Sequence, residues 1–248
     1  MGLSLSAINP ALERAFKMRG AKAVALAINC PGGSPVQSAL IAGRIRALAR
    51  EKSLPVVAFI EDVGASGGYW LALAGDEIFA APSSIVGSIG VVHASFGFAD
   101  VLHRVGIERR LYTAGSKKSL LDPFQPQDPE DIDRLMEIMT EIHGDFKSMV
   151  RQRRGERLRA ADDEVFEGQI WTGRKAAELG LIDGLGDLHG LMRERFGDKV
   201  KLPHVGAARP WWRRRLRVRP GPTEARAMAD ALLDALVERS LWARYGLG

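Results

Sequence analysis

The first feature of this sequence that could take part in catalysis is a serine flanked by small residues. Ser66 is the middle residue of the pentapeptide GASGG at 64–68, directly after the apolar run at 55–60. Such a turn can place a serine hydroxyl at the start of a helix, exposed and close to backbone N–H groups. Those N–H groups would stabilise the oxyanion that forms when a serine attacks a carbonyl. The alternative is that the glycines only let a helix pack closely on a strand.

A second glycine-rich turn, NCPGGSP at 29–35, follows the apolar run at 23–28. Loops at the carboxyl ends of neighbouring parallel strands converge in an open α/β sheet. We therefore expect Gly32 and Gly33 to present N–H groups opposite Ser66.

None of the five histidines lies in a comparably distinctive loop, although Ser66 needs a base. His103 and His143 fall within helical patterns, and His189 lies just inside another. His93 follows an expected strand and is the hardest histidine to dismiss. For each histidine, the alternative to acting as the base is a polar role, either at the surface or in a hydrogen bond within the protein.

Lysine is the other candidate base. An unperturbed lysine has a pKa of about 10.4, so a lysine that acts as a base near neutral pH must be sheltered from water. Lys118 lies in a glycine- and serine-containing loop with Leu120, Leu121 and Phe124 just beyond it, whereas Lys117 is expected to be solvated. Spacing alone leaves open that both are exposed loop lysines.

The remaining elements predict an α/β core with mostly parallel strands. Expected strands lie at 23–28, 55–60, 77–81, 85–92, 109–113 and 181–186, and expected helices at 10–18, 35–51, 69–74, 100–105, 128–154, 172–179, 188–195 and 223–245. We divide the chain into a domain at 1–204 and a basic extension at 205–248.

Composition limits the classes of protein. The chain has 248 residues, 46% of them apolar, and a single cysteine, Cys30, which excludes an intramolecular disulfide framework. The formal net charge is +5, and the stretch RPWWRRRLRVR at 209–219 contains six arginines and no acidic residue. No apolar run approaches a membrane span and no secretory signal is visible, so we expect a cytoplasmic protein or one peripheral to a membrane.

Four motifs in order resemble the signal peptide peptidase A, or protease IV, family of serine-lysine peptidases. The resemblance covers residues 9–200, and its motifs are NCPGGS at 29–34, ASGGY at 65–69, SSIVGSIGV at 83–91 and KS-x2-DPF at 118–124. It implies Ser66 as the nucleophile and Lys118 as the general base, chosen over Lys117 by its distance from Pro123. Ser88 matches the position that hydrogen-bonds the lysine amine.

The resemblance also implies an oxyanion hole made by the N–H groups of Gly33 and Gly67, with Gly32, Ser34 and Gly68 contacting the peptide substrate. The implied fold is the Clp/crotonase-like superhelix of repeated ββα units, with a helical C-terminal extension here. Family members form homo-oligomers with active sites near subunit interfaces and use no cofactor or metal. Signal peptide remnants and other short apolar peptides are the implied substrates.

Three departures from the family pattern stand out. Cys30 replaces the usual serine, the family's leading strand and membrane anchor are not visible before Leu3, and the basic extension aligns with no motif. Trp211 and Trp212, beside the arginines, are candidates for contact with an anionic membrane surface. A solvated linker is the plainer alternative, and nucleic-acid binding is the least favoured.

Three rival functions remain open. An α/β-hydrolase esterase also fits G-x-S-x-G but needs a downstream histidine, for which His143, His189 and His204 are available. A crotonase-like acyl-thioester enzyme would use the same oxyanion geometry without a serine nucleophile. A non-catalytic assembly protein would keep the fold with a decayed site.

Overall fold

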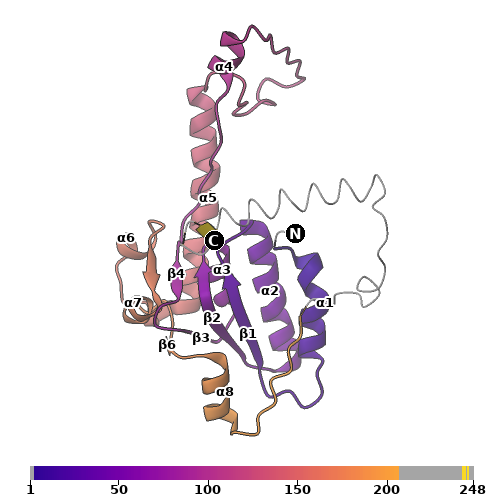
Figure 1. Cartoon of the computed structure of the whole chain (residues 1–248), viewed down its shortest axis with the longest axis vertical. Coiled ribbons are helices and arrows are strands. Elements are labelled where there is room, and N and C mark those ends of the chain that lie inside the picture. Colours follow the sequence, from indigo (N-terminus) through magenta and orange to yellow (C-terminus); the bar gives the residue numbers. More distant parts are fainter. Residues whose placement is uncertain (1–2, 207–241, 244, 246–248) are drawn as a thin grey trace. The chain divides into compact units, whose positions relative to one another are not determined.

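The structure is a computed structural model that describes residues 3–206, 242, 243 and 245 (Figure 1). These residues form two compact units, which are described separately. The larger contains the described residues up to Ile89 and from Lys147 onward, and the smaller is Gly90–Phe146. The domain boundary expected after residue 204 stays a prediction, because 207–241 lie outside the described residues. So does the helix expected at 223–245, apart from 242, 243 and 245.

The larger unit alternates strands and helices as the sequence predicts. Up to Ile89 it contains α1 (Leu5–Phe16), β1 (Val24–Cys30), α2 (Pro35–Lys52), β2 (Val56–Ala65), α3 (Gly67–Ala72), β3 (Glu77–Ala80) and β4 (Ile85–Gly87). After the smaller unit it continues with a 3₁₀ turn (Gly155–Arg157), α6 (Asp162–Val165), β5 (Ile170–Thr172), α7 (Gly173–Glu178), β6 (Gly184–Leu185) and α8 (Leu188–Phe196). The smaller unit contains α4 (Ala99–Arg104) and most of α5 (Pro129–Arg154), which ends in the larger unit.

Strand β2 is the centre of the sheet. It pairs in parallel with β1 along one edge, whereas on the other edge its first half pairs with β3 and its second half with β4. Strand β6 extends the sheet in parallel beyond β3, and β5 pairs antiparallel with β4. The predicted α/β class with mostly parallel strands is confirmed. Because β2 changes neighbours partway along, its end projects beyond β3 toward the turn that carries Ser66.

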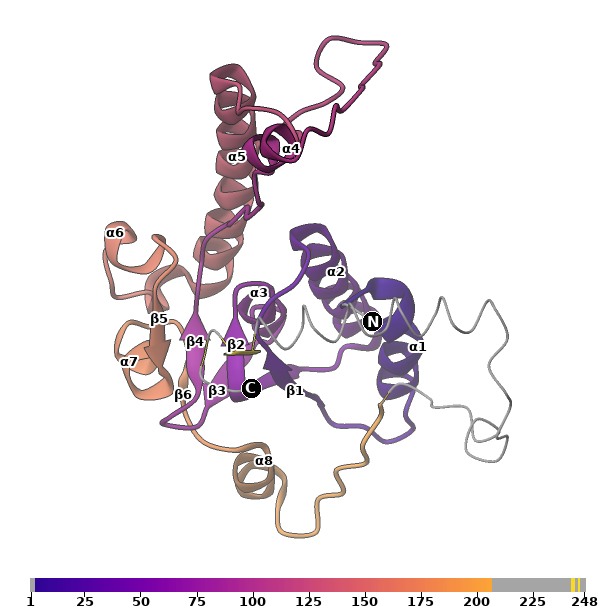
Figure 2. The same ribbon diagram turned by 45° about the horizontal axis from the view of Figure 1, so that its top comes forward.

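Helices cover both faces of this sheet. Helices α1, α2 and α3 lie on one side and α8 on the other (Figure 2). On the α8 side, Val57 and Phe59 of β2 pack with Met192 of α8, and all three are at most 2% exposed. Burying such side chains stabilises the fold by about 1.5–3 kcal/mol each. This packing fixes the strand that leads to Ser66.

Two predicted strands are wrong in extent. The strand expected at 85–92 ends at Gly87, because Gly87 and Ser88 have positive φ angles of 113° and 53° that turn the chain out of the sheet. The strand expected at 109–113 is not formed, since this segment has no neighbouring strand among the described residues. The first helix begins at Leu5 rather than near Pro10, and the backbone N–H of Leu5 donates to the Gln37 side chain (2.9 Å).

Candidate active site

Ser66 occupies the sharp turn between β2 and α3. Its backbone angles, φ 52° and ψ −121°, lie in a region that residues with side chains rarely adopt. The backbone N–H of Ser66 donates to the carbonyl of Gly87 at the end of β4 (2.8 Å), which holds the turn against the sheet. The residue is half-buried. Strained backbone conformations of this kind cluster at functional sites.

The two glycine-rich turns meet, as the sequence predicts. A Cβ built on Gly32 would lie 3.7 Å from Ser66 Oγ. A Cβ on Gly67 would lie 3.1 Å from the backbone nitrogen of Gly33, and one on Gly68 would lie 2.1 Å from the Cys30 carbonyl oxygen. Only glycine permits such close approach of two backbones. The segments that carry the Gly33 and Gly67 nitrogens are therefore immediate neighbours beside Ser66.

The turn that contains Gly33 is tied to the start of α2. The carbonyl of Ser34 accepts hydrogen bonds from the backbone N–H and from the hydroxyl of Ser38 (3.0 Å each). Ser38 is fully buried, whereas Ser34 is exposed. In the same turn, the carbonyl of Pro31 accepts a hydrogen bond from the hydroxyl of Tyr245 (3.4 Å). Ser34 is thus accessible to a ligand, and its backbone is held in place.

Ser88 lies close to the serine turn along the backbone of the neighbouring strand. Ala65 is the register partner of Gly87, which immediately precedes Ser88. The backbone N–H of Ser88 donates to the carbonyl of Gln169 (2.6 Å), and the residue is half-buried. Ser66 and Ser88 each follow one residue of that register pair, so they lie on adjacent strand ends. The hydrogen bond from Ser88 to the lysine amine that the resemblance implied stays a prediction.

Lys118 belongs to the smaller unit, whereas Ser66 belongs to the larger one. The backbone N–H of Lys118 donates to the carbonyl of Gly115 (3.2 Å), which closes a turn, and the Lys118 side chain is exposed. The two apolar side chains expected to shelter this amine are exposed in the part of the chain that the structure describes, Leu120 to 38% and Phe124 to 39%.

The neighbouring lysine is engaged elsewhere. Lys117 Nζ forms an ion pair with Glu130 (2.5 Å). The hydrogen bond to this carboxylate raises the pKa of Lys117 above its usual value, so its amine stays protonated. Lys118 forms no ion pair among the described residues. The structure thus separates two adjacent lysines that sequence spacing alone could not tell apart.

An arginine anchors the segment that follows Lys118, and the sequence did not single it out. Arg109 pairs with the carboxylate of Asp122 (2.8 Å) and lies over the ring of Phe124 (5.3 Å to the centroid). Phe98 stacks on the same ring, and its backbone N–H donates to the carbonyl of Pro123 (2.6 Å). The DPF motif is therefore a packing point for this loop. Arg109 lies within the segment at 109–113 that was expected to form a strand.

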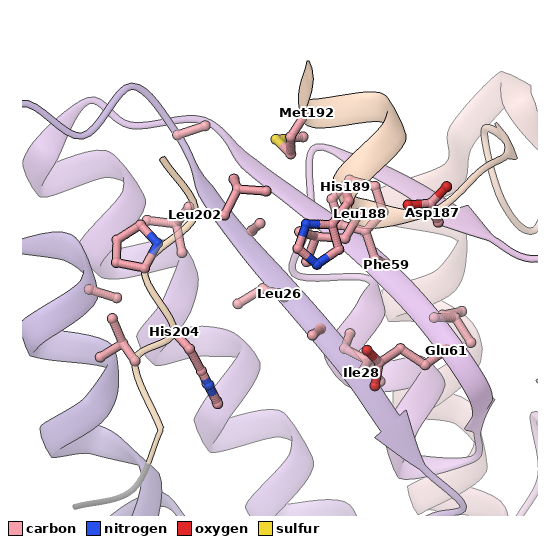
Figure 3. Close-up of a pocket in the computed structure, with 18 of the residues that line it drawn as sticks. Leu26, Ile28, Phe59, Glu61, Asp187, Leu188, His189, Met192, Leu202 and His204 are labelled. Carbon is pink, nitrogen blue, oxygen red and sulfur yellow. The ribbon is translucent and has the colours of Figure 1, made fainter. Parts of the chain in front are cut away.

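A large hollow elsewhere in the larger unit does not include the serine. Its volume is about 1720 Å³ and it follows β1, between α1 and α8 (Figure 3). Leu26, Phe59 and Met192 give it apolar walls, and His189 and His204 also line it. Ser66 and the two glycine turns are not among its lining residues. These two histidines therefore face a different feature of the larger unit.

Four further expectations from the sequence concern Cys30, metal binding, membrane-spanning helices and the two tryptophans of the extension. The thiol of Cys30 donates to the carbonyl of Gly32 (3.3 Å), so this residue packs within the turn. In the part of the chain that the structure describes, no cluster of histidine, cysteine and carboxylate side chains is arranged to hold a metal ion. Over the same residues, no helix is long and apolar enough to cross a bilayer. Trp211 and Trp212 lie outside the described residues.

Comparison with known proteins gives the same family as the motifs. Residues 48–198 match peptidase family S49. The chain is 52% identical over 253 residues to a protein of Brucella abortus named Na(+)/H(+) antiporter NhaA, covering 99% of this chain and 34% of that protein. It is 33% identical over 171 residues to the chloroplastic serine protease SPPA of Arabidopsis thaliana, covering 67% of this chain and 24% of the plant protein.

Protease 4 of Salmonella typhi is 32% identical over 170 residues, covering 67% of this chain and 26% of that enzyme. The chain thus spans only about a quarter to a third of the length of these relatives. The match to the family nevertheless extends over more than half of the chain and includes Ser66, Ser88 and Lys118. The chain belongs to peptidase family S49.

Proposed function

We propose that this protein is a serine peptidase in which Ser66 is the nucleophile and the N–H groups of Gly33 and Gly67 form the oxyanion hole. The observation that carries the proposal is the meeting of the two glycine turns beside Ser66. The backbones are so close there that a Cβ added to Gly67 would lie 3.1 Å from the backbone nitrogen of Gly33. Preorganised N–H donors of this kind contribute a large share of the rate enhancement in acyl transfer.

Lys118 is the proposed general base. Lys117 is a poor candidate because Glu130 holds its amine protonated. No ion pair among the described residues occupies Lys118, so its amine is free to approach a serine. Ser88, next to Ser66 on the adjacent strand end, is the proposed hydrogen-bond partner of that amine. Exposure of Lys118 in the single chain is the reason to propose that another subunit completes its surroundings.

The reaction follows from these roles. The Ser66 hydroxyl attacks the peptide carbonyl carbon, and its proton passes to the neutral amine of Lys118. The tetrahedral intermediate collapses with cleavage of the C–N bond, and Lys118 returns the proton to the leaving amine. Water then hydrolyses the acyl-enzyme by the same route. Gly32, Ser34 and Gly68 line the approach of the peptide backbone.

Short, extended apolar peptides such as signal peptide remnants are the proposed substrates. This proposal rests on the family and on a relative from Enterococcus faecium that is named for signal peptide peptidase activity. A homo-oligomer with the Clp/crotonase-like superhelical fold is proposed on the same basis. Peripheral membrane contact through Trp211 and Trp212 is a further part of the proposal.

Two measurements test the proposed function. A fluorophosphonate probe should label Ser66, and Ser66→Ala should remove both the adduct and peptide hydrolysis. Lys118→Ala should abolish hydrolysis, whereas Lys117→Ala is the matched control and should retain it. Retained activity in Lys118→Ala would eliminate the dyad. Loss of activity on changing His143, His189 or His204 would instead favour an esterase with a histidine base.

A further inference from the structure

Strand β2 contains an irregular segment just before the serine turn. Ile28 of β1 pairs with Ile60 of β2, but the next register pair is Cys30 with Gly64. Strand β1 therefore advances two residues while β2 advances four, which is a bulge of two residues in β2. Over the same interval, β2 leaves β3 at Ile60 and joins β4 at Val63. Glu61 and Asp62 have no register partner on either side.

Asn29 binds this bulge from the β1 side. Its side-chain oxygen accepts a hydrogen bond from the backbone N–H of Val63 (3.1 Å). Its side-chain nitrogen donates to the carboxylate of Asp62 (2.7 Å). The Val63 N–H would otherwise have no partner in the interrupted ladder between β1 and β2. One side chain thus replaces the missing backbone pairing.

Ser84 binds the bulge from the opposite side. It lies in the turn between β3 and β4 and is 2% exposed. Its hydroxyl lies within hydrogen-bond distance of two acceptors, the carbonyls of Ile60 (3.2 Å) and Glu61. It also accepts a hydrogen bond from the backbone N–H of Ala81 (3.0 Å). Ser84 thus links the end of β3 to the bulge of β2.

We propose that Asn29 and Ser84 are positioning residues that set the place of Ser66 relative to the oxyanion-hole nitrogens, an inference that rests on the proposed function. The chain from the bulge to Ser66 is only Val63, Gly64 and Ala65, all fully buried in the strand. A shift of the bulge therefore passes directly to Ser66.

The expected size of the effect follows from the sensitivity of catalysis to geometry. A misplacement of about 1 Å at a reacting group costs roughly a hundredfold in rate. Asn29 is the first residue of the turn that holds Gly33, so its bonds to β2 tie the two halves of the proposed oxyanion hole together. Loss of these bonds should lower kcat and leave KM nearly unchanged, because neither side chain is proposed to contact the substrate.

Matched variants separate the two bonds of Asn29. Asn29→Asp keeps an acceptor for the Val63 N–H but removes the donor to Asp62 and sets two carboxylates side by side. Adding Asp62→Asn reverses donor and acceptor and restores the pair. We expect Asn29→Asp to lower kcat and the rate of fluorophosphonate labelling of Ser66 by roughly tenfold or more, and the double variant to recover most of both. Glu61→Gln, on the same bulge, is the control and should change neither.

Ser84→Ala tests the other side of the bulge, with the exposed neighbour Ser83→Ala as its control. We expect Ser84→Ala to lower kcat and labelling by roughly a hundredfold and Ser83→Ala to leave them unchanged. Circular dichroism and thermal unfolding identify a variant that fails to fold. Because Asn29 is exposed, its variants keep the inference testable even where Ser84→Ala unfolds.

Wild-type kcat and labelling in folded Asn29→Asp and Ser84→Ala would overturn the inference, and so would equal losses in Ser83→Ala and Ser84→Ala. Failure of the proposed function is a different result, in which the unaltered protein is neither labelled at Ser66 nor active on peptides. In that case, crystal structures of the same variants would test the inference. It is overturned if Ser66 keeps its position relative to the Gly33 nitrogen in these variants.

Discussion

At the scale of single residues, the site depends on backbone atoms that side chains would keep apart. A Cβ on Gly67 would lie 2.5 Å from Ser38 Oγ and 3.1 Å from the Gly33 nitrogen. Ser38 is fully buried and bonded to the Ser34 carbonyl, so it has little room to move. The two turns can therefore approach each other this closely only because residue 67 has no side chain.

Gly67→Ala should accordingly damage the site more than the fold. The added methyl group pushes the Gly33 turn away from Ser66, and we expect a loss of peptide hydrolysis of roughly a hundredfold. Gly43→Ala is the matched control, because an added Cβ there meets nothing within 4 Å. Gly43 lies within α2, where this change should raise stability by about 0.5–1 kcal/mol. Hydrolysis rates and urea unfolding of both variants provide the test, and equal activity would contradict the argument.

At the scale of elements, a buried charge network joins the end of α5 to the sheet. Arg154 is 2% exposed and forms a two-point ion pair with Asp183 (2.8 and 3.1 Å). Asp183 also accepts the backbone N–H of Ile78 at the start of β3 (2.7 Å) and a bond from Arg157 (3.0 Å). Burial alone would raise the pKa of Asp183, but the bonds from Arg154 and Ile78 hold it below its usual value.

Asp183→Asn should therefore destabilise the protein at neutral pH. It leaves the buried guanidinium of Arg154 without a counter-charge, which costs roughly 3–5 kcal/mol. A carboxylate whose pKa is lowered by folding stabilises the native state above its unfolded pKa of about 3.9, and this contribution is lost as the pH falls below that value. Urea unfolding at neutral pH and at successively lower pH should show a smaller acid-dependent loss in Asp183→Asn. The exposed Asp198→Asn should behave as the unaltered protein does.

The elements also show what the sequence could and could not predict. The convergence of the turns at 29–35 and 64–68 follows from two glycine-rich turns after two buried parallel strands, and it was predicted correctly. The β2 bulge was not, because it depends on hydrogen bonds from Asn29 and Ser84, which lie 34 and 23 residues away in the chain. The strand expected at 109–113 was wrong, because Arg109 pairs with Asp122 and the described residues place no strand beside this segment. Local pattern indicates propensity, whereas strand formation needs a partner.

At the scale of the molecule, the smaller unit leaves many of its large apolar side chains exposed. Its exposed large hydrophobic residues are Val92, Phe96, Phe98, Val101, Val105, Ile107, Leu111, Tyr112, Leu120, Phe124, Ile132, Met136 and Ile138. A soluble protein rarely leaves so many apolar groups in water over one short segment, which supports the proposed homo-oligomer.

Charges placed in this apolar segment should therefore prevent assembly. Val101 and Ile107 are 53% and 58% exposed, so neither side chain is needed for folding of the single chain. We expect Val101→Asp with Ile107→Asp to shift the protein to monomers in light scattering and to abolish peptide hydrolysis, because Lys118 then stays in water. Gln152→Asp, at an exposed position on α5, is the control. A monomeric double variant with full activity would contradict the proposed role of assembly.

Mixing two inactive variants would show whether Ser66 and Lys118 act within one chain or between chains. Ser66→Ala keeps the lysine and Lys118→Ala keeps the serine. Suppose that each site takes its serine from one subunit and its lysine from another. Exchange of subunits between the two variants then forms some sites that contain both residues, and hydrolysis returns. If one chain supplies both residues, every site in the mixture lacks one of them and the mixture stays inactive. Because Ser66 and Lys118 belong to separate compact units, and Lys118 is exposed among the residues that the structure describes, we expect hydrolysis to return after subunit exchange. The same mixture carrying Val101→Asp and Ile107→Asp in both chains should stay inactive, because activity between chains requires the contact that these charges disrupt.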